Sequence, residues 1–167
     1  MPASLLPYHD TKPVGAADFY FAINATFRFI LKRFGKQGLR QYWRDLGSQY
    51  FAPVSVIWKT RGLPGVAAYW NAFFAAEPGA AAKVALRRDS VVVEVKTCPA
   101  IRHLRKHRRK IVPCFCQQCF FVNEAIAAPA GLTVRVQGGN GRCRQTFLPR
   151  NPAIPNQKIS AIREAAC

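Results

Sequence analysis

The chain has 167 residues, of which 50% are hydrophobic, and it contains twelve Phe, five Tyr and three Trp. This composition excludes an intrinsically disordered chain, and the length suits one domain that buries a core without disulfide bonds. The 25 Lys and Arg residues outnumber the 8 Asp and Glu residues, and the formal net charge of +17 favours anionic partners without specifying the anion.

The first half of the chain has a helical pattern. Residues 1–14 lack hydrophobic periodicity and are expected to form an N-terminal arm. Apolar residues recur three or four apart over 18–34 and again over 39–51, where the second helix can resume as far as Trp58. A third helix is predicted over 64–76, with a proline in its first turn. No apolar tract is long enough to span a membrane.

The second half contains two predicted hairpins. Short β-rich runs at 83–88 and 90–96 flank Arg88-Asp89, which is typical of a turn. Runs at 132–137 and 142–148 flank a glycine-rich tight turn, Gly-Gly-Asn-Gly.

Two further helices separate these hairpins, one short and very basic over 100–110 and one over 114–128 that opens on cysteines. We therefore predict an α+β fold in which N-terminal helices pack on an antiparallel sheet of two hairpins. One domain is expected over 15–149. A tail over 150–167 follows, and it can form a short helix over 160–166.

Five of the six cysteines lie between Cys98 and Cys143, each at the end of a predicted element or in a strand. The N-terminus lacks the basic start and apolar stretch of a secretory signal, so we expect a reducing, cytoplasmic location. There, cysteines are more often thiols or metal ligands than disulfides. Thiolates at a helix start are stabilised by the helix dipole.

A metal site is one reading of these cysteines. Cys116-x-x-Cys119 has ligand spacing, and the fold would have to bring in Cys98 or Cys114 together with Cys143. We predict Cys98, Cys116, Cys119 and Cys143 as ligands of zinc, manganese or an iron–sulfur cluster. The alternative is that these cysteines pack as small buried apolar residues. No role is assigned to Cys114 or Cys167.

Among the carboxylates, Glu124 is the main candidate for a general acid or base. It follows Cys119 on the same predicted helix within the otherwise apolar stretch FFVNEAIAA. A buried carboxyl with a raised pKa there could act as a general acid or base. The alternative places Glu124 on an exposed polar stripe beside Asn123.

The basic run RHLRKHRRK carries His103 and His107 four residues apart, a spacing that can bind metal. No acidic residue lies beside them in sequence, which favours a solvated basic face. The run has no interleaved aromatic residues and no known nucleic-acid-binding motif, which disfavours a nucleic-acid partner. A small anionic ligand or an acidic protein partner is expected instead, and the oligomeric state is left open.

Three segments together resemble the L-2-amino-thiazoline-4-carboxylic acid hydrolase-like family: VEVKTCPAIRHL, CFCQQCFFVNEAIAAPAGLTVRV and GGNGRCRQTF. The matching positions are Cys98-Pro99, Cys116 or Cys119, and Gly141 with Cys143. The layout is also similar to the small-molecule-binding fold of the 4-vinyl reductase type and of transport-particle subunits.

The resemblance implies a hydrolase that opens a five-membered cyclic amidine by breaking a C–N bond. Cys98, Cys119 and Glu124 would then be catalytic, and Arg102 and Arg142 would hold a substrate carboxylate. The chain departs from the family in its basicity and in the triple Cys114, Cys116, Cys119. The alternative function is a non-catalytic module that binds a metal, an iron–sulfur cluster or a small ligand, as a sensor or as an accessory subunit.

Overall fold

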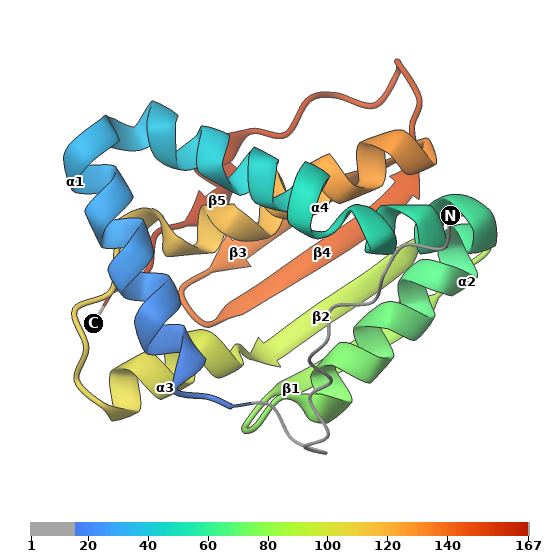
Figure 1. Cartoon of the computed structure of the whole chain (residues 1–167). Coiled ribbons are helices and arrows are strands. Elements are labelled where there is room, and N and C mark those ends of the chain that lie inside the picture. The colour runs from blue at the N-terminus through green and yellow to red at the C-terminus, as the bar shows by residue number, and fades with distance from the viewer. Residues whose placement is uncertain (1–15, 167) are drawn as a thin grey trace, which may run out of the picture.

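A computed structural model describes residues 16–166 and shows helices packed on one face of a sheet (Figure 1). The predicted N-terminal arm, residues 1–14, and Cys167 lie outside the described residues. The sheet order is β1-β2-β4-β3-β5, with β1 Ala81–Leu86, β2 Val91–Thr97, β3 Leu132–Gly139, β4 Arg142–Pro149 and β5 Ile162–Arg163. The predicted α+β class is confirmed.

The two predicted hairpins are present, as β1–β2 and β3–β4, and they join through antiparallel pairing of β2 with β4. The sheet is nevertheless mixed, because β5 pairs in parallel with the end of β3. The expectation of a purely antiparallel sheet is wrong at this edge. The tail contains a 3₁₀ turn at Ile159–Ala161 followed by β5, where the sequence suggested a short helix.

The first three predicted helices form two long, kinked ones. Helix α1 spans Phe19–Asp45, a π-helical turn follows at Leu46–Tyr50, and α2 spans Ala52–Ala76. Each helix changes direction at a glycine with positive φ, 69° at Gly35 and 58° at Gly62, and helical pairing resumes beyond it. Glycine adopts this backbone conformation without a steric penalty, so the sequence interruptions bend the helices and do not end them.

Two short helices connect the hairpins. Helix α3 spans Pro99–Lys106, with Cys98 at its N-cap. A 3₁₀ turn at Pro113–Gln117 then leads into α4, Gln118–Ala127, so the predicted cysteine-bearing helix begins later than expected. A 3₁₀ turn at Ala128–Ala130 connects α4 to β3.

The core has two apolar clusters. In the first, Val93 of β2 and Phe147 of β4 lie in the same cluster as Trp58 and Trp70 of α2. In the second, Trp43 of α1 packs with residues of α3, the 3₁₀ turn and α4. Helices α2 and α4 thus cover one face of the sheet. Within residues 16–166, no helix is both long enough and apolar enough to cross a membrane.

Candidate functional site: four thiols beside a tyrosine–glutamate pair

Four cysteines from four different elements meet where β2 ends, α3 and α4 begin, and the β3–β4 turn closes. Cys98 caps α3, Cys116 lies in the 3₁₀ turn, Cys119 is in the first turn of α4, and Cys143 is in β4. We refer to these four residues as the thiol group. Figure 1 shows the end of β2, the start of α3 and the β3–β4 turn side by side.

The β3–β4 turn ties the thiol group together through backbone hydrogen bonds. The amide of Cys98 donates to the carbonyl of Gly141 at 2.9 Å, and the amide of Asn140 donates to Cys116 Sγ at 3.3 Å. Cys143 lies opposite Val95 in the β2–β4 pairing. The glycine-rich turn therefore connects three of the four cysteines.

Burial raises the pKa of every thiol in this group. The pKa of Cys119 lies well above its ordinary value, first because of burial and then because of the neighbouring thiols of Cys143, Cys116 and Cys98. The pKa of Cys143 is raised to about 12 by burial and by its neighbours Cys98 and Cys116. Desolvation disfavours the charged form, and here it outweighs the helix-start stabilisation of thiolates expected from the sequence.

The described residues do not form the metal site predicted from the sequence. Among residues 16–166, no three or more His, Cys, Asp and Glu side chains are arranged to hold a metal ion. Cys116 Sγ accepts a hydrogen bond from the Asn140 amide. The described residues therefore lend no support to ligation of zinc, manganese or an iron–sulfur cluster, and the four predicted ligands stay a prediction.

The histidine pair has a partner that sequence proximity did not reveal. His103 Nε2 lies 3.0 Å from an Asp18 carboxylate oxygen just before α1. The His103 and His107 rings lie 4.5 Å apart between centroids, and both pack against Phe21. These contacts fasten α3 to the start of α1.

A tyrosine–glutamate pair lies beside the thiol group, and the sequence reading missed it. Tyr20 Oη of α1 donates to the Glu77 carboxylate at 2.5 Å. The pKa of Tyr20 is raised by burial, then by Glu77, and further by Cys98 and Cys119. Glu77 also raises the pKa of Cys98, although burial is the larger cause. The carboxylate and the phenol thus interact electrostatically with the thiols, and Tyr20 packs in the same apolar cluster as Cys98.

Glu77 lies outside every predicted helix and strand, so the sequence pattern does not single it out. Its signal in the sequence is weak: it is the only carboxylate between Asp45 and Asp89, and it immediately precedes Pro78-Gly79. The neighbouring turn is held by Arg102, whose Nη1 donates to the Gly79 carbonyl at 3.0 Å. Arg102 is exposed and lies at the margin of the site.

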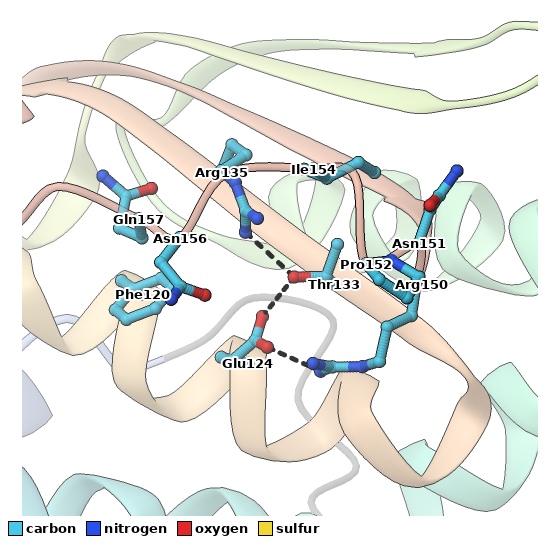
Figure 2. Close-up of a pocket in the computed structure, with 10 residues that line it drawn as sticks. All are labelled: Phe120, Glu124, Thr133, Arg135, Arg150, Asn151, Pro152, Ile154, Asn156 and Gln157. Atoms are coloured by element: carbon cyan, nitrogen blue, oxygen red, sulfur yellow. Dashed lines mark hydrogen bonds and ion pairs between the residues drawn. The ribbon is translucent and has the colours of Figure 1, made fainter.

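Glu124 lies elsewhere, in a separate pocket of about 380 Å³ between α4, β3 and residues 150–157 (Figure 2). One carboxylate oxygen accepts from Thr133 Oγ1 and from the Val134 amide, both at 2.9 Å. The other oxygen is 2.6 Å from Arg150 Nη2. Both oxygens are thus occupied by the edge of β3 and its covering segment, and the geometry does not bring Glu124 to the thiol group.

Arg142 and Cys114 are also separated from the thiol group. Successive strand residues face opposite sides of a sheet, so Arg142 lies on the open face while Cys143 packs against the helix-covered core. Cys114 is buried in the second apolar cluster, where it packs as a small apolar side chain.

The thiol group with Tyr20 and Glu77 therefore combines neutral thiols, a carboxylate and a phenol at one place, with Arg102 at its margin. Such a set can accept a proton, donate protons and hold an anionic substituent. Comparisons of the chain with protein-family models, with curated proteins and with solved structures find no match.

Proposed function

We propose that this chain is a hydrolase-like enzyme that opens a small cyclic amidine by hydrolysis of a C–N bond at the thiol group. The observation that carries the proposal is the Tyr20–Glu77 pair beside Cys98 and Cys119. The resemblance of the Cys98-Pro99, Cys116 or Cys119, and Gly141 to Cys143 motifs supports the substrate class. The reducing cytoplasm is the proposed location, because it keeps the four thiols reduced.

Glu77 is the base in the proposed reaction. A water oxygen forms a bond to the amidine carbon while the water proton passes to the Glu77 carboxylate. The ring C–N bond then breaks, and the departing nitrogen takes a proton from the Cys98 or Cys119 thiol. The Glu77 proton returns to that thiolate, so the net change is the addition of one water to the substrate.

Burial raises the pKa of these thiols and keeps them protonated. They therefore suit the role of proton donor better than the role of nucleophile, which requires a thiolate. Arg102 can hold a substrate carboxylate at the margin of the site, since its guanidinium retains donors beyond the one that binds Gly79. Glu124, which the sequence suggested as catalytic, has no part in this scheme because its carboxylate braces β3.

The test is turnover of a panel of five-membered cyclic amidine carboxylates by the reduced full chain, followed by mass spectrometry for a product heavier by one water. Glu77→Gln is expected to lower kcat by roughly 10²-fold or more, the usual contribution of a general base. Cys98→Ser and Cys119→Ser should also lower it. Cys114→Ala is the matched control, since that cysteine packs in the second cluster.

Two results would contradict the proposal. One is full activity in Glu77→Gln and Cys98→Ser, which would remove the pair and the thiol from the reaction. The other is a folded wild-type chain that turns over no member of the panel.

A second candidate is a non-catalytic small-ligand module, acting as a sensor or as an accessory subunit. The raised pKa of all four thiols favours it, because neutral thiols line a binding site without supplying a nucleophile. A saturable rise in Tm with a panel compound, without any product, would identify this function in place of hydrolysis.

A further inference from the structure

A broad groove of about 570 Å³ lies where β2 and β3 end and β4 begins, on the face of the sheet that α2 and α4 do not cover. Four exposed cationic side chains line it, from three different strands: Lys96, Arg142, Arg144 and Arg163. We propose that this cationic groove, defined by these four residues, binds a small oligophosphate.

The strand register places the cations next to one another. Val95 of β2 pairs with Cys143 of β4. Lys96 directly follows Val95 and Arg142 directly precedes Cys143, so the side chains of Lys96 and Arg142 are neighbours across the two strands. Gly139 lies opposite Arg142 on one side and opposite Arg163 of β5 on the other. The parallel strand β5 is thus the third strand that contributes a cation, Arg163, to the groove.

Gly139 lets the backbone of β5 approach β3 closely beside the groove. A Cβ at this position would lie 2.3 Å from the carbonyl oxygen of Arg163, and the backbone φ of 141° is unfavourable for other residues. The close approach of β5, which brings Arg163 to the groove, therefore requires glycine at this position.

The positive charge of the groove is largely uncompensated. Glu94 is the one carboxylate that lines it, and it lies 4.0 Å from Arg144, with both side chains about half exposed. In the described part of the chain, no carboxylate lies within ion-pair distance of Lys96, Arg142 or Arg163. Like charges on neighbouring strands repel one another, and a bound anion would offset that repulsion.

The lining favours phosphate groups over nucleobases or apolar ligands. It contains no aromatic residue on which a base could stack. Arginine guanidinium groups form paired hydrogen bonds with phosphate oxygens, and three of the four cations are arginines. A chain of two or three linked phosphates offers several anionic groups within one groove, either as an inorganic oligophosphate or as part of a nucleotide.

The test is isothermal titration of the reduced full chain with inorganic triphosphate and with ATP, at about 150 mM salt, where long-range attraction is screened. The groove variant K96Q/R142Q/R163Q is compared with R28Q/K32Q/R33Q, which removes the same charge from exposed positions of α1. Saturable binding should weaken at least about tenfold in the groove variant and less than twofold in the α1 variant.

The two ligands distinguish the source of the phosphates. Equal affinity for triphosphate and ATP would show recognition of phosphate alone, and tighter binding of ATP would point to a nucleotide, and both support the proposal. Equal weakening in the two variants, absence of saturable binding, or tighter groove-dependent binding of an oligo-glutamate peptide would overturn it. The single variant Arg142→Gln, checked for fold by circular dichroism, should show the same direction if the triple variant unfolds.

Discussion

At the scale of single residues, the Glu124 carboxylate holds the edge of β3 and is not an isolated acid. Its carboxylate accepts from Thr133 and Val134 and pairs with Arg150, and it is the more buried partner of that pair, with 25% of its side chain exposed against 47% for Arg150. Removal of the carboxylate would leave donors of the β3 edge without their acceptor. That loss is more costly than the loss of an exposed ion pair.

We therefore expect Glu124→Ala to lower the free energy of unfolding by about 1–3 kcal/mol, the cost of leaving partly buried donors unsatisfied. Urea unfolding measures it. Glu94→Ala is the matched control, because its pair with Arg144 is long and half exposed, and it should cost less than about 0.5 kcal/mol. Equal losses in the two variants would show that Glu124 does not brace β3.

The raised pKa values of the thiols make the free energy of unfolding depend on pH in the alkaline range. The pKa of Cys143 rises from its ordinary value of 9.0 to about 12 in the folded chain. The unfolded chain therefore releases this proton first, so the contribution to stability is complete below pH 9 and is lost as the pH rises toward 12. Tyr20 and Tyr69 shift in the same direction from a higher ordinary value of 10.0.

Under reducing conditions, the free energy of unfolding should fall by up to about 1 kcal/mol for each such thiol between pH 9 and pH 10. Urea midpoints at pH 8, 9 and 10 measure this fall. Cys143→Ser should show a smaller fall than the parent chain, whereas Cys114→Ser should keep more of it. An identical fall in the parent and in Cys143→Ser would mean that this thiol is not shifted.

At the scale of elements, β3 is an edge strand along most of its length, and side chains cover that edge. Arg150 donates to the Leu132 carbonyl, Glu124 accepts from the Val134 amide, and Gln157 both accepts from the Val136 amide and donates to its carbonyl. Beyond Val136, β5 takes over as a true strand. Capping by side chains keeps an edge from pairing with another chain.

Gln157→Ala is expected to speed hydrogen exchange of the Val136 amide by roughly five- to tenfold, since one hydrogen bond worth about 1 kcal/mol is lost. The Val93 amide in the central strand β2 is the internal control and should not change. Unchanged exchange at Val136 would show that water replaces the Gln157 amide without cost.

The sequence predicted helices and strands well where hydrophobic residues recur periodically. It predicted them less well where contacts with segments distant in sequence determine the local structure. The two hairpins follow from β-branched runs and the glycine turn. The continuity of α1 and α2 through Gly35 and Gly62 could not be read from the sequence, because a glycine can end a helix or bend it. The strand β5 has only two residues, and it exists because the end of β3 offers it a partner.

At the scale of the whole molecule, the sequence predicted four cysteines of the candidate site but not the Tyr20–Glu77 pair. The spacing of the cysteines drew attention to Cys98, Cys116, Cys119 and Cys143. The pairing of Glu77 with Tyr20 could not be predicted, because the two are 57 residues apart in sequence and only the tertiary fold brings them together. Conversely, Glu124 is close to Cys119 in sequence but reaches the β3 edge.

The pairing of β2 with β4 has a consequence for how the chain folds. Each hairpin can form locally, but β2 and β4 come from different hairpins, with α3, α4 and β3 between them in sequence. Closing so long a segment costs chain entropy, so this pairing is expected to be a slow, late event. Cys143 lies opposite Val95 in that same pairing, and Cys98 follows shortly after it. The thiol group is consequently assembled in the step that completes the sheet, and partly folded chains with separate hairpins have no site.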